Sequence, residues 1–481
     1  MQAGHVLLGV GRHARTRRVV GLAATTALVA GTALAGTAVG QHERGHLQCG
    51  DVVTFEVSLN SDVGPCPGVG LIIGADNVTL DLNGHSVTGN PQARADRGAE
   101  AQDAPGIVFR GVSGSAVRNG TVRDFDAGIV IRGGSGNDVS NVTVRDNINY
   151  RILTGVNADP GGPSITDDPP PCDFGDGIAV FNSSGNQIRD SRVMNNGPFS
   201  GISLVENSDA NLVSRNFIAR NNVVNVVREG ARENLGERTV CGTATEQGPM
   251  TRGRELQDSG VRIEGPGADD NRVQRNEIRE SGLTGVSVHG YVCNPPAEGG
   301  GDRPPPPAAP NNGGNLVFKN TVTGTGVRGP NGQLIDPIAD GIATLQQGPA
   351  TIVCVAFGNT ISQNVSRDNG RDGIFLGGRG SNDNVVINNR VNDNGRDGLH
   401  LEGPSTNQQG EVVRPGAINN RLLANKGRSN ERFDGFDGNL NPPCDNNMWR
   451  GNQFRTVNHP CVWGPSGRPG GRDNDRDNGQ L

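Results

Sequence analysis

Two groups of titratable residues fall at positions that a short strand would place on one face. The segments 260–264 and 285–289 each begin with Gly and then alternate apolar and polar residues. Because side chains alternate along a strand, the polar residues of each segment share one face. If the two strands are neighbours, Arg262, Glu264 and His289 form a cluster that points away from the core. This is the first candidate catalytic site.

The second candidate site lies in a strand that begins near Gly398. His400 and Glu402 share its outward face, with Asp372 and Asp397 at the adjoining turns. Both sites offer groups for proton transfer at a sugar ring or for holding a uronate carboxylate, and their two histidines are the preferred general bases. The alternative is structural, because polar residues on a strand surface are mostly solvated and repeated Asp-Gly pairs form turns.

The sequence leaves one kind of metal site open, a site for Ca²⁺. Clustered Asp and Asn side chains supply the oxygen ligands that Ca²⁺ takes, although the sequence has no nonapeptide calcium repeat. A zinc-type site is not indicated, because no C-x-x-C occurs and the His–Cys neighbours at His46, His289 and His459 are scattered. The sequence therefore predicts no definite cofactor, with Ca²⁺ as the one candidate ion.

The candidate residues belong to a repeat, which is clearest between positions 359 and 403. Asn359 matches Asn384, and Asn364 matches Asn389, each at an offset of 25 residues. A period of about 20–50 residues indicates a repeat architecture. An anchoring Asn, followed two positions later by an apolar residue, recurs at 137, 186, 211, 271, 315, 359, 384 and 447, with a poorer copy at 420. Most copies have a second Asn five positions after the first.

Each repeat unit can form three short strands with bends between them. Asn suits a bend because it tolerates left-handed backbone and bonds its own main chain, and stacked Asn side chains can bond to each other from coil to coil. Helical repeats are excluded because no apolar spacing of three and four is sustained. Leucine-rich repeats would place Leu where Val and Ile dominate here. The pattern predicts an all-β, single-stranded parallel β-helix of about eleven coils.

Extra residues interrupt the repeat in five places. They fall at about 155–175, 229–258, 291–313, 327–338 and 403–415. In a solenoid such insertions become loops on one face, which is often the binding face.

The composition agrees with a solenoid and excludes one class of partner. Of 481 residues, 74 are Gly and only 4% are aromatic, which suits many tight turns around a narrow aliphatic core. The formal net charge is -6, with both signs interspersed. A nucleic-acid-binding domain normally carries a basic patch, so no nucleic acid partner is expected.

The ends of the chain predict export. Residues 1–40 have a basic start, a small and apolar run, and an A-x-A cleavage candidate at Ala33–Ala35, which is typical of a signal peptide. The alternative, a membrane anchor, would need stronger hydrophobicity, and no other stretch is apolar enough to cross a bilayer. We expect a secreted, extracellular protein without stable membrane insertion after cleavage. Its mature part divides into an N-terminal cap segment at 41–76, a β-helix domain at 77–463 and a disordered tail at 464–481.

Eight cysteines fit disulfides in an oxidising compartment. Cys49 and Cys66 lie close in the sequence, as do Cys444 and Cys461, so we expect one local bridge at each end of the array. The pairing of the other four is open: Cys172, Cys241, Cys293 and Cys354.

The repeat resembles that of right-handed parallel β-helix proteins of the pectate-lyase-like superfamily. More narrowly, it resembles secreted bacterial proteins with NosD-like, carbohydrate-binding and sugar-hydrolase β-helix repeats. The likeness covers about residues 49–463 and rests on the segment 80–85 (LDLNGH), the recurring Asn, and the Asp-Gly turns at Asp176, Asp340, Asp372 and Asp397. It implies a right-handed β-helix. The paired-Asp and Gly-His-Gly motifs of polygalacturonases and the Asp-Pro-His-Asp motif of mannuronan epimerases are absent, so no catalytic residue carries over.

Three functions are open as hypotheses. The leading one is a secreted protein that binds or modifies an extracellular polysaccharide, as a lyase, hydrolase or epimerase that acts by general acid–base chemistry. The first alternative is a non-catalytic cell-envelope or adhesion protein that displays loops on a rigid fold. The second is a NosD-like accessory factor for metal-enzyme maturation, which the 8 His and 4 Met disfavour because they form no copper-type cluster.

Overall fold

The computed structural model describes most of the chain between residues 46 and 464. The described ranges are 46–91, 104–148, 175–197, 199–221, 259–264, 267–290, 312–328, 334–336, 339–346, 356–377, 381–406, 408–410, 412–414, 416–439, 444 and 446–464. The chain divides into two units, Met1–His42 and Glu43–Leu481, and all of the described residues belong to the second unit. The predicted signal peptide, the predicted tail beyond residue 464 and large parts of the insertions lie outside the described residues.

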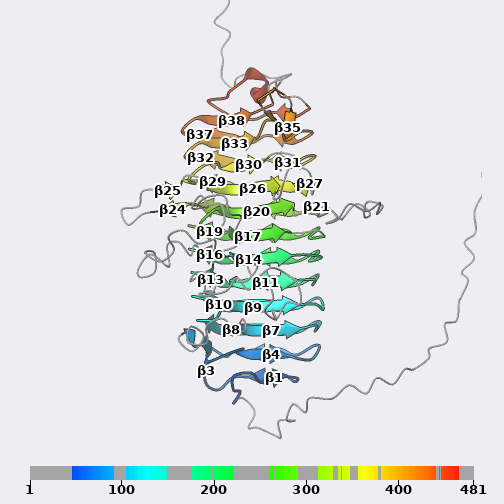
Figure 1. Cartoon of the computed structure of the whole chain (residues 1–481), viewed down its shortest axis with the longest axis vertical. Coiled ribbons are helices and arrows are strands. Elements are labelled where there is room, and N and C mark those ends of the chain that lie inside the picture. The colour runs from blue at the N-terminus through cyan, green and yellow to red at the C-terminus, as the bar shows by residue number, and fades with distance from the viewer. Residues whose placement is uncertain are drawn as a thin grey trace, which may run out of the picture. The chain divides into compact units, whose positions relative to one another are not determined.

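One parallel sheet, here termed the long sheet, runs through the whole described unit. Its strands are β1 (Val52–Val53), β4 (Leu71–Ile73), β7 (Pro105–Arg110), β9 (Ala127–Arg132), β11 (Ile178–Phe181), β14 (Ser200–Val205), β17 (Ser259–Glu264), β20 (Thr284–Gly290), β26 (Asp340–Gln346), β30 (Ile374–Leu376), β33 (Asp397–Leu401) and β38 (Phe433–Asp437). Figure 1 shows them stacked in chain order, from β1 at one end to β38 near the other.

Two further columns of parallel strands complete each turn of the chain. The second column contains β2 (Val57–Ser58), β5 (Thr79–Asp81), β8 (Ala116–Arg123), β10 (Asp138–Arg145), β12 (Gln187–Arg189), β15 (Leu212–Ser214), β18 (Arg272–Gln274), β22 (Leu316–Phe318), β28 (Thr360–Ser362), β31 (Val385–Ile387), β36 (Arg421–Leu423) and β39 (Met448–Arg450). The third contains β3 (Val63–Cys66), β6 (Ser86–Gly89), β13 (Arg192–Met194), β16 (Phe217–Ala219), β19 (Glu277–Arg279), β23 (Thr321–Thr323), β29 (Val365–Arg367), β32 (Arg390–Asn392) and β37 (Lys426–Arg428). The eight-residue strands β8 and β10 take part in both columns.

Short pairs and a single turn of 3-10 helix complete the described elements. β21 (Asn312–Gly313) pairs with β27 (Ala356–Phe357) in parallel. Two antiparallel pairs fall in the predicted insertions: β24 (Val327–Arg328) with β25 (Leu334–Asp336), and β34 (Ser405–Thr406) with β35 (Val412–Arg414). The 3-10 helix η4 (Pro460–Trp463) comes after the last strand.

This architecture is the predicted right-handed parallel β-helix. The long sheet has twelve strands, one more than the prediction of about eleven coils. The extra strand is β1, which lies in the segment predicted to be a cap and nevertheless pairs with β4 in the same sheet. Inward residues such as Ile129, Ile178 and Ile202 lie in register from coil to coil and are fully buried. A strand of three residues buries only one inward side chain. The fold is therefore stabilised by the stacking of each coil on its neighbours.

Buried Asn side chains bond along the stack, as predicted. In the first ladder each Asn after Asn137 accepts, at Oδ1, the backbone N–H of the Asn one coil earlier. Its members are Asn137, Asn186, Asn211, Asn271, Asn315, Asn359, Asn384, Asn420 and Asn447. The second ladder contains Asn216, Asn276, Asn320, Asn364, Asn389, Asn425 and Asn452. The copy at Asn420, which looked poor in the sequence, is a full member.

The left-handed backbone at these bends belongs to the residue before the ladder Asn. Asp383 has φ 56° and Asn388 has φ 57°, and they precede Asn384 and Asn389. The prediction that the ladder Asn itself supplies the left-handed residue is therefore wrong at these positions. The corner is made one residue earlier, and this turns the ladder side chain inward to bond along the stack.

Disulfides join Cys49 to Cys66 and Cys444 to Cys461, as predicted, and each closes a segment of 17 residues. The other four cysteines lie outside the described residues. Within the described ranges, no helix combines the length and the apolar character of a membrane span.

Candidate functional site

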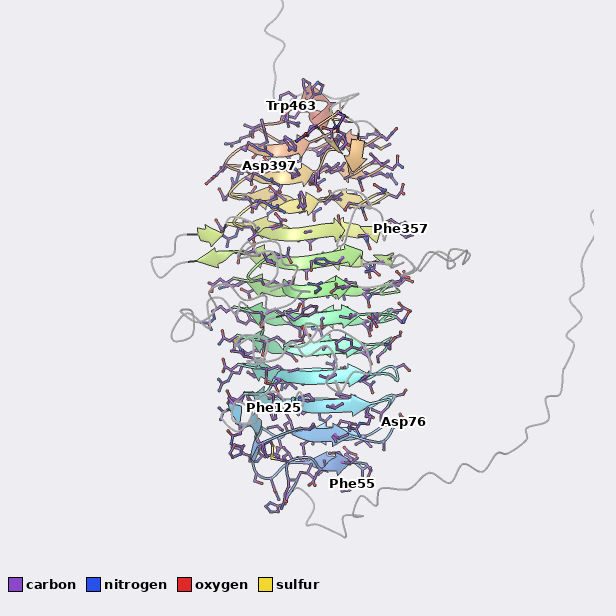
Figure 2. All side chains as sticks on the ribbon, in the orientation of Figure 1. Phe55, Asp76, Phe125, Phe357, Asp397 and Trp463 are labelled. Carbon is purple, nitrogen blue, oxygen red and sulfur yellow. A yellow bond between two sulfur atoms is a disulfide. The ribbon has the colours of Figure 1, made fainter. Side chains whose placement is uncertain are left out.

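His400 is the centre of a compact cluster in the C-terminal part of the long sheet. It lies on β33, and its register partners are Phe375 on β30 and Phe436 on β38. Its Nδ1 is 2.7 Å from Oδ2 of Asp397, which begins the same strand, and 3.9 Å from Oδ2 of Asp372 one coil earlier. Figure 2 labels Asp397 near the C-terminal end of the stacked strands. We term Asp372, Asp397 and His400 the His400 cluster.

The acids of the His400 cluster belong to a ladder of Asp–Arg pairs. Each Asp accepts two N–H bonds from an Arg of the following coil: Asp340 from Arg371, Asp372 from Arg396, and Asp397 from Arg432. The Nε to Oδ1 distances are 2.8, 2.8 and 3.0 Å. The same Oδ1 atoms accept a backbone N–H of the following coil at 3.1, 3.0 and 3.1 Å. Such two-pronged pairs fix geometry as well as charge.

Aromatic rings flank the imidazole along the stack. Phe436 stacks on His400 with ring centroids 4.5 Å apart, and Phe375 lies at 5.3 Å on the other side. The Arg432 guanidinium is 4.3 Å from the Phe436 ring centroid, which is cation–π range. His400 is only 6% exposed, whereas the side chains of Arg396 and Arg432 are 31% and 42% exposed. The cations are therefore the accessible part of this site.

The two acids of the cluster are shifted in opposite directions. Burial raises the pKa of Asp372 above its usual value, although the bond from Arg396 opposes the rise. Burial also pushes the pKa of Asp397 upward, but the bonds from His400 and Arg432 outweigh it, and its pKa lies below the usual value. Acids whose pKa values are pushed apart are typical of acid–base sites. Asp397 can therefore stay ionised while it orients the imidazole.

The His400 cluster suits Ca²⁺ poorly. Its three ligand atoms lie within 4.8 Å of one another, and no other such group of three occurs in the described part of the chain. Both carboxylates are already bonded to guanidinium groups, and Ca²⁺ takes oxygen ligands rather than an imidazole nitrogen. A cation here would have to displace two arginines, so the pairing argues against the ion that the sequence left open.

The first candidate cluster is also assembled, but it is buried. Arg262 donates from Nε to Glu264, and Glu264 is in register with His289 on the next strand. The Arg262 guanidinium lies 4.4 Å from the ring centroid of Phe199. The three candidate residues are 1%, 4% and 9% exposed. Burial, and then the charge of Arg262, hold the pKa of His289 well below its usual value.

Glu402 is the one candidate residue of the second site that does not bond to the His400 cluster in the described ranges, and the ladder arginines were not among the candidates. Glu402 comes directly after β33 and is exposed, and within the described ranges no hydrogen bond joins its side chain to the His400 cluster. Sequence reasoning overlooked the three arginines of the ladder, Arg371, Arg396 and Arg432. A signal was present, because Arg-Asp-Gly occurs at 371–373 and again at 396–398, one repeat later.

Comparison with known proteins gives a partial family match. Residues 70–253 match the model of a family described as periplasmic copper-binding protein (NosD), which is less than half of this chain. The fold of this chain is a parallel β-helix. The comparison with curated proteins gives no match.

Several solved structures are similar. The Dettilon tailspike protein is 14% identical, with 85% of this chain and 62% of that chain covered and a TM-score of 0.46. The A-module of the mannuronan C-5 epimerase AlgE6 of Azotobacter vinelandii is 13% identical, with 85% of each chain covered and a TM-score of 0.44. A pectate lyase is 12% identical, with 84% and 80% covered and a TM-score of 0.42. This chain thus spans less than two thirds of the tailspike protein.

In the described part of the segment that matches the copper-binding family, no group of three potential metal ligands occurs. Residues 70–253 contain a single histidine, His85, which lies 3.4 Å from an Asp62 oxygen. Copper sites are built from imidazole, thiolate and thioether groups. The one group of three potential ligands found in the described ranges lies beyond this segment, at the His400 cluster. The described residues of the matched segment therefore do not form a copper site.

Proposed function

We propose that this protein binds or modifies an extracellular polysaccharide, with the His400 cluster as its reacting site. The observation that carries the proposal is the 2.7 Å approach of His400 Nδ1 to Asp397 Oδ2, beside Asp372 at 3.9 Å. A carboxylate on Nδ1 orients the imidazole and makes Nε2 the nitrogen that exchanges a proton with the ligand.

The charge around the cluster favours an acidic sugar. Arg396 and Arg432 each bond an Asp through Nε and Nη2. A guanidinium has five N–H donors, so the Nη1 groups of these half-exposed side chains can hold a uronate carboxylate. Such a cation also stabilises the charge that develops when a proton next to a carboxylate is removed. The half-buried ring of Phe436 offers an apolar face to the sugar ring.

Among the three reaction types, proton abstraction fits better than hydrolysis. Glycoside hydrolysis usually needs two carboxyl groups that flank the scissile bond, about 5–9.5 Å apart. Asp372 and Asp397 have no exposed surface, and their ligand atoms lie within 4.8 Å of each other. A sugar does not fit between them. A histidine base beside arginine instead suits a lyase or an epimerase.

Export is part of the proposal. Disulfides such as Cys49–Cys66 and Cys444–Cys461 persist in oxidising compartments, which supports a location outside the cytoplasm. The predicted signal peptide at 1–40 supports secretion.

The main alternative is a non-catalytic cell-envelope or adhesion protein. One observation favours it: the carboxylates of Asp372 and Asp397 are fully buried and saturated by arginine, as in a structural ion-pair ladder. The partial family match keeps a NosD-like accessory role as a further alternative, although the described part of the matched segment holds no group of three potential metal ligands.

The test is a screen of the secreted protein against uronate-containing and neutral polysaccharides. It reads out unsaturated products, new reducing ends and pull-down. We expect His400→Gln to lower turnover of a uronate polymer by about 10²–10⁴-fold. The control is His85→Gln, which removes a histidine that is 32% exposed near the other end of the stack. Activity that survives His400→Gln would refute the site assignment. If no polysaccharide yields a product and none is pulled down with the protein, the carbohydrate proposal is refuted.

A further inference from the structure

A second polar surface lies on the outward face of β14, β17 and β20, separated from β33 by β26 and β30. The register places its side chains in three rows across the strands: Ser200, Ser259 and Thr284; Ser203, Arg262 and Ser287; Val205, Glu264 and His289. Eight of these nine side chains are polar, and all nine are at most 9% exposed. We term them the polar patch.

Stability alone does not account for the polar patch. The outward face of a β-helix has no need of buried polar groups, because burying them costs free energy unless they are bonded. A buried ion pair such as Arg262–Glu264 is commonly no more stabilising than apolar residues of the same size. Elsewhere on the same face the long sheet uses apolar side chains, for example Val130 and Ala179.

Three groups in the polar patch are buried without a hydrogen-bond partner. They are the hydroxyls of Ser200 and Ser203 and Nδ1 of His289. By contrast, the Ser259 hydroxyl lies 2.7 Å from that of Thr284 and 3.2 Å from that of Ser287. Buried polar groups are almost always bonded, and an unbonded one indicates a missing ligand or water. The open groups lie on β14 and β20, on either side of the Arg262–Glu264 pair on β17.

The charge of the polar patch selects the ligand class. The carboxylate of Glu264 balances the guanidinium of Arg262, and burial keeps the pKa of His289 low, so this imidazole is neutral at neutral pH. An anionic ligand would be repelled by the Glu264 carboxylate, and a cationic ligand would be repelled by the Arg262 guanidinium. The polar patch therefore favours an uncharged ligand. A hydroxyl is both donor and acceptor, and so it can bond to two serine hydroxyls and a neutral imidazole.

We infer that the polar patch binds an uncharged, hydroxyl-rich group of the neutral-sugar class through Ser200, Ser203 and His289. This is a site distinct from the His400 cluster. It extends the proposed function, because a polysaccharide with neutral and acidic units could occupy both, but it does not depend on chemistry at His400.

The test measures binding of neutral gluco-, manno- and galacto-oligosaccharides to the full chain by titration calorimetry, with oligogalacturonates as the acidic probe. We expect Ser203→Ala to weaken binding of a neutral probe about tenfold, equivalent to about 1.4 kcal/mol. The matched control is Ser214→Ala on β15, because that hydroxyl is equally buried and also lacks a partner. It should leave the affinity unchanged.

The possible failures are distinguishable. Neutral-sugar binding that is lost in His400→Gln and kept in Ser203→Ala overturns this inference and leaves the proposed function standing. Acidic probes that bind through Ser203 overturn the assignment of the ligand class. If no neutral probe binds, the patch holds only water and the inference is wrong. The proposed function is refuted only if the uronate polymers also show neither turnover nor binding.

Discussion

Two ladder asparagines with the same burial should differ several-fold in their contribution to stability. Asn389 and Asn315 are both fully buried, Asn389 in the second ladder and Asn315 in the first. At Asn389, Oδ1 accepts the backbone N–H and the Nδ2 of Asn364, and Nδ2 donates to the Ile361 carbonyl and to Asn425. At Asn315, Oδ1 accepts the backbone N–H of Asn271, and Nδ2 has no partner.

The expected magnitudes are set by these bonds. Asn389→Ala removes four side-chain hydrogen bonds, and at about 1 kcal/mol each this lowers the free energy of unfolding by about 4 kcal/mol. Asn315→Ala removes one bond together with a donor that was already unsatisfied, so its cost is about 1 kcal/mol or less. Both substitutions delete the same atoms from a fully buried ladder position.

The measurement is equilibrium unfolding in guanidinium with the disulfides intact, followed by circular dichroism. Because the array is long, unfolding by two probes must coincide before a free energy is assigned. Equal losses for Asn389→Ala and Asn315→Ala would refute the reasoning, since they would show that volume, rather than bonding along the stack, sets the contribution of a ladder asparagine.

Two further outcomes are expected. The pKa of Asp397 is lower in the folded protein than in the unfolded chain, so this residue stabilises the fold above about pH 4 and the contribution is lost as the pH falls through the folded value. The difference in melting temperature between the wild type and Asp397→Asn should therefore be largest near neutral pH and shrink in acid; a constant difference contradicts this. Replacing Cys444 and Cys461 by Ser should lower stability by about 3 kcal/mol, because the bridge closes a short loop. The Cys49 and Cys66 pair, with the same 17-residue separation, is the matched comparison, and unchanged melting of both double variants would contradict the expectation.

Much of the fold was predictable because its signals are local and repeated. The Asn period, the apolar residue two positions later and the short Cys spacings all occur within one or two coils, and each coil copies the last. The predicted coil count of about eleven left out β1, because the sequence assigned residues 41–76 to a cap, whereas β1 pairs with β4 in the long sheet.

The candidate sites were predicted only in part. Alternation along a strand placed Arg262, Glu264 and His289 together, and the Asp-Gly turns placed Asp372 and Asp397 near His400. Their surroundings were not predictable in this way. Burial on the outward face and the pairing of each Asp with an Arg of the following coil depend on contacts between coils.

The sequence by itself determined the repeat, the strand faces and the end bridges, because these depend on side-chain alternation and on distances along the chain. Only the tertiary structure decided which polar groups are satisfied. Arg371, Arg396 and Arg432 reach back across one coil to bond an Asp, whereas Ser200, Ser203 and His289 are buried without partners. Hydrogen bonding is directional and short-ranged, so it depends on the register and burial of neighbouring coils.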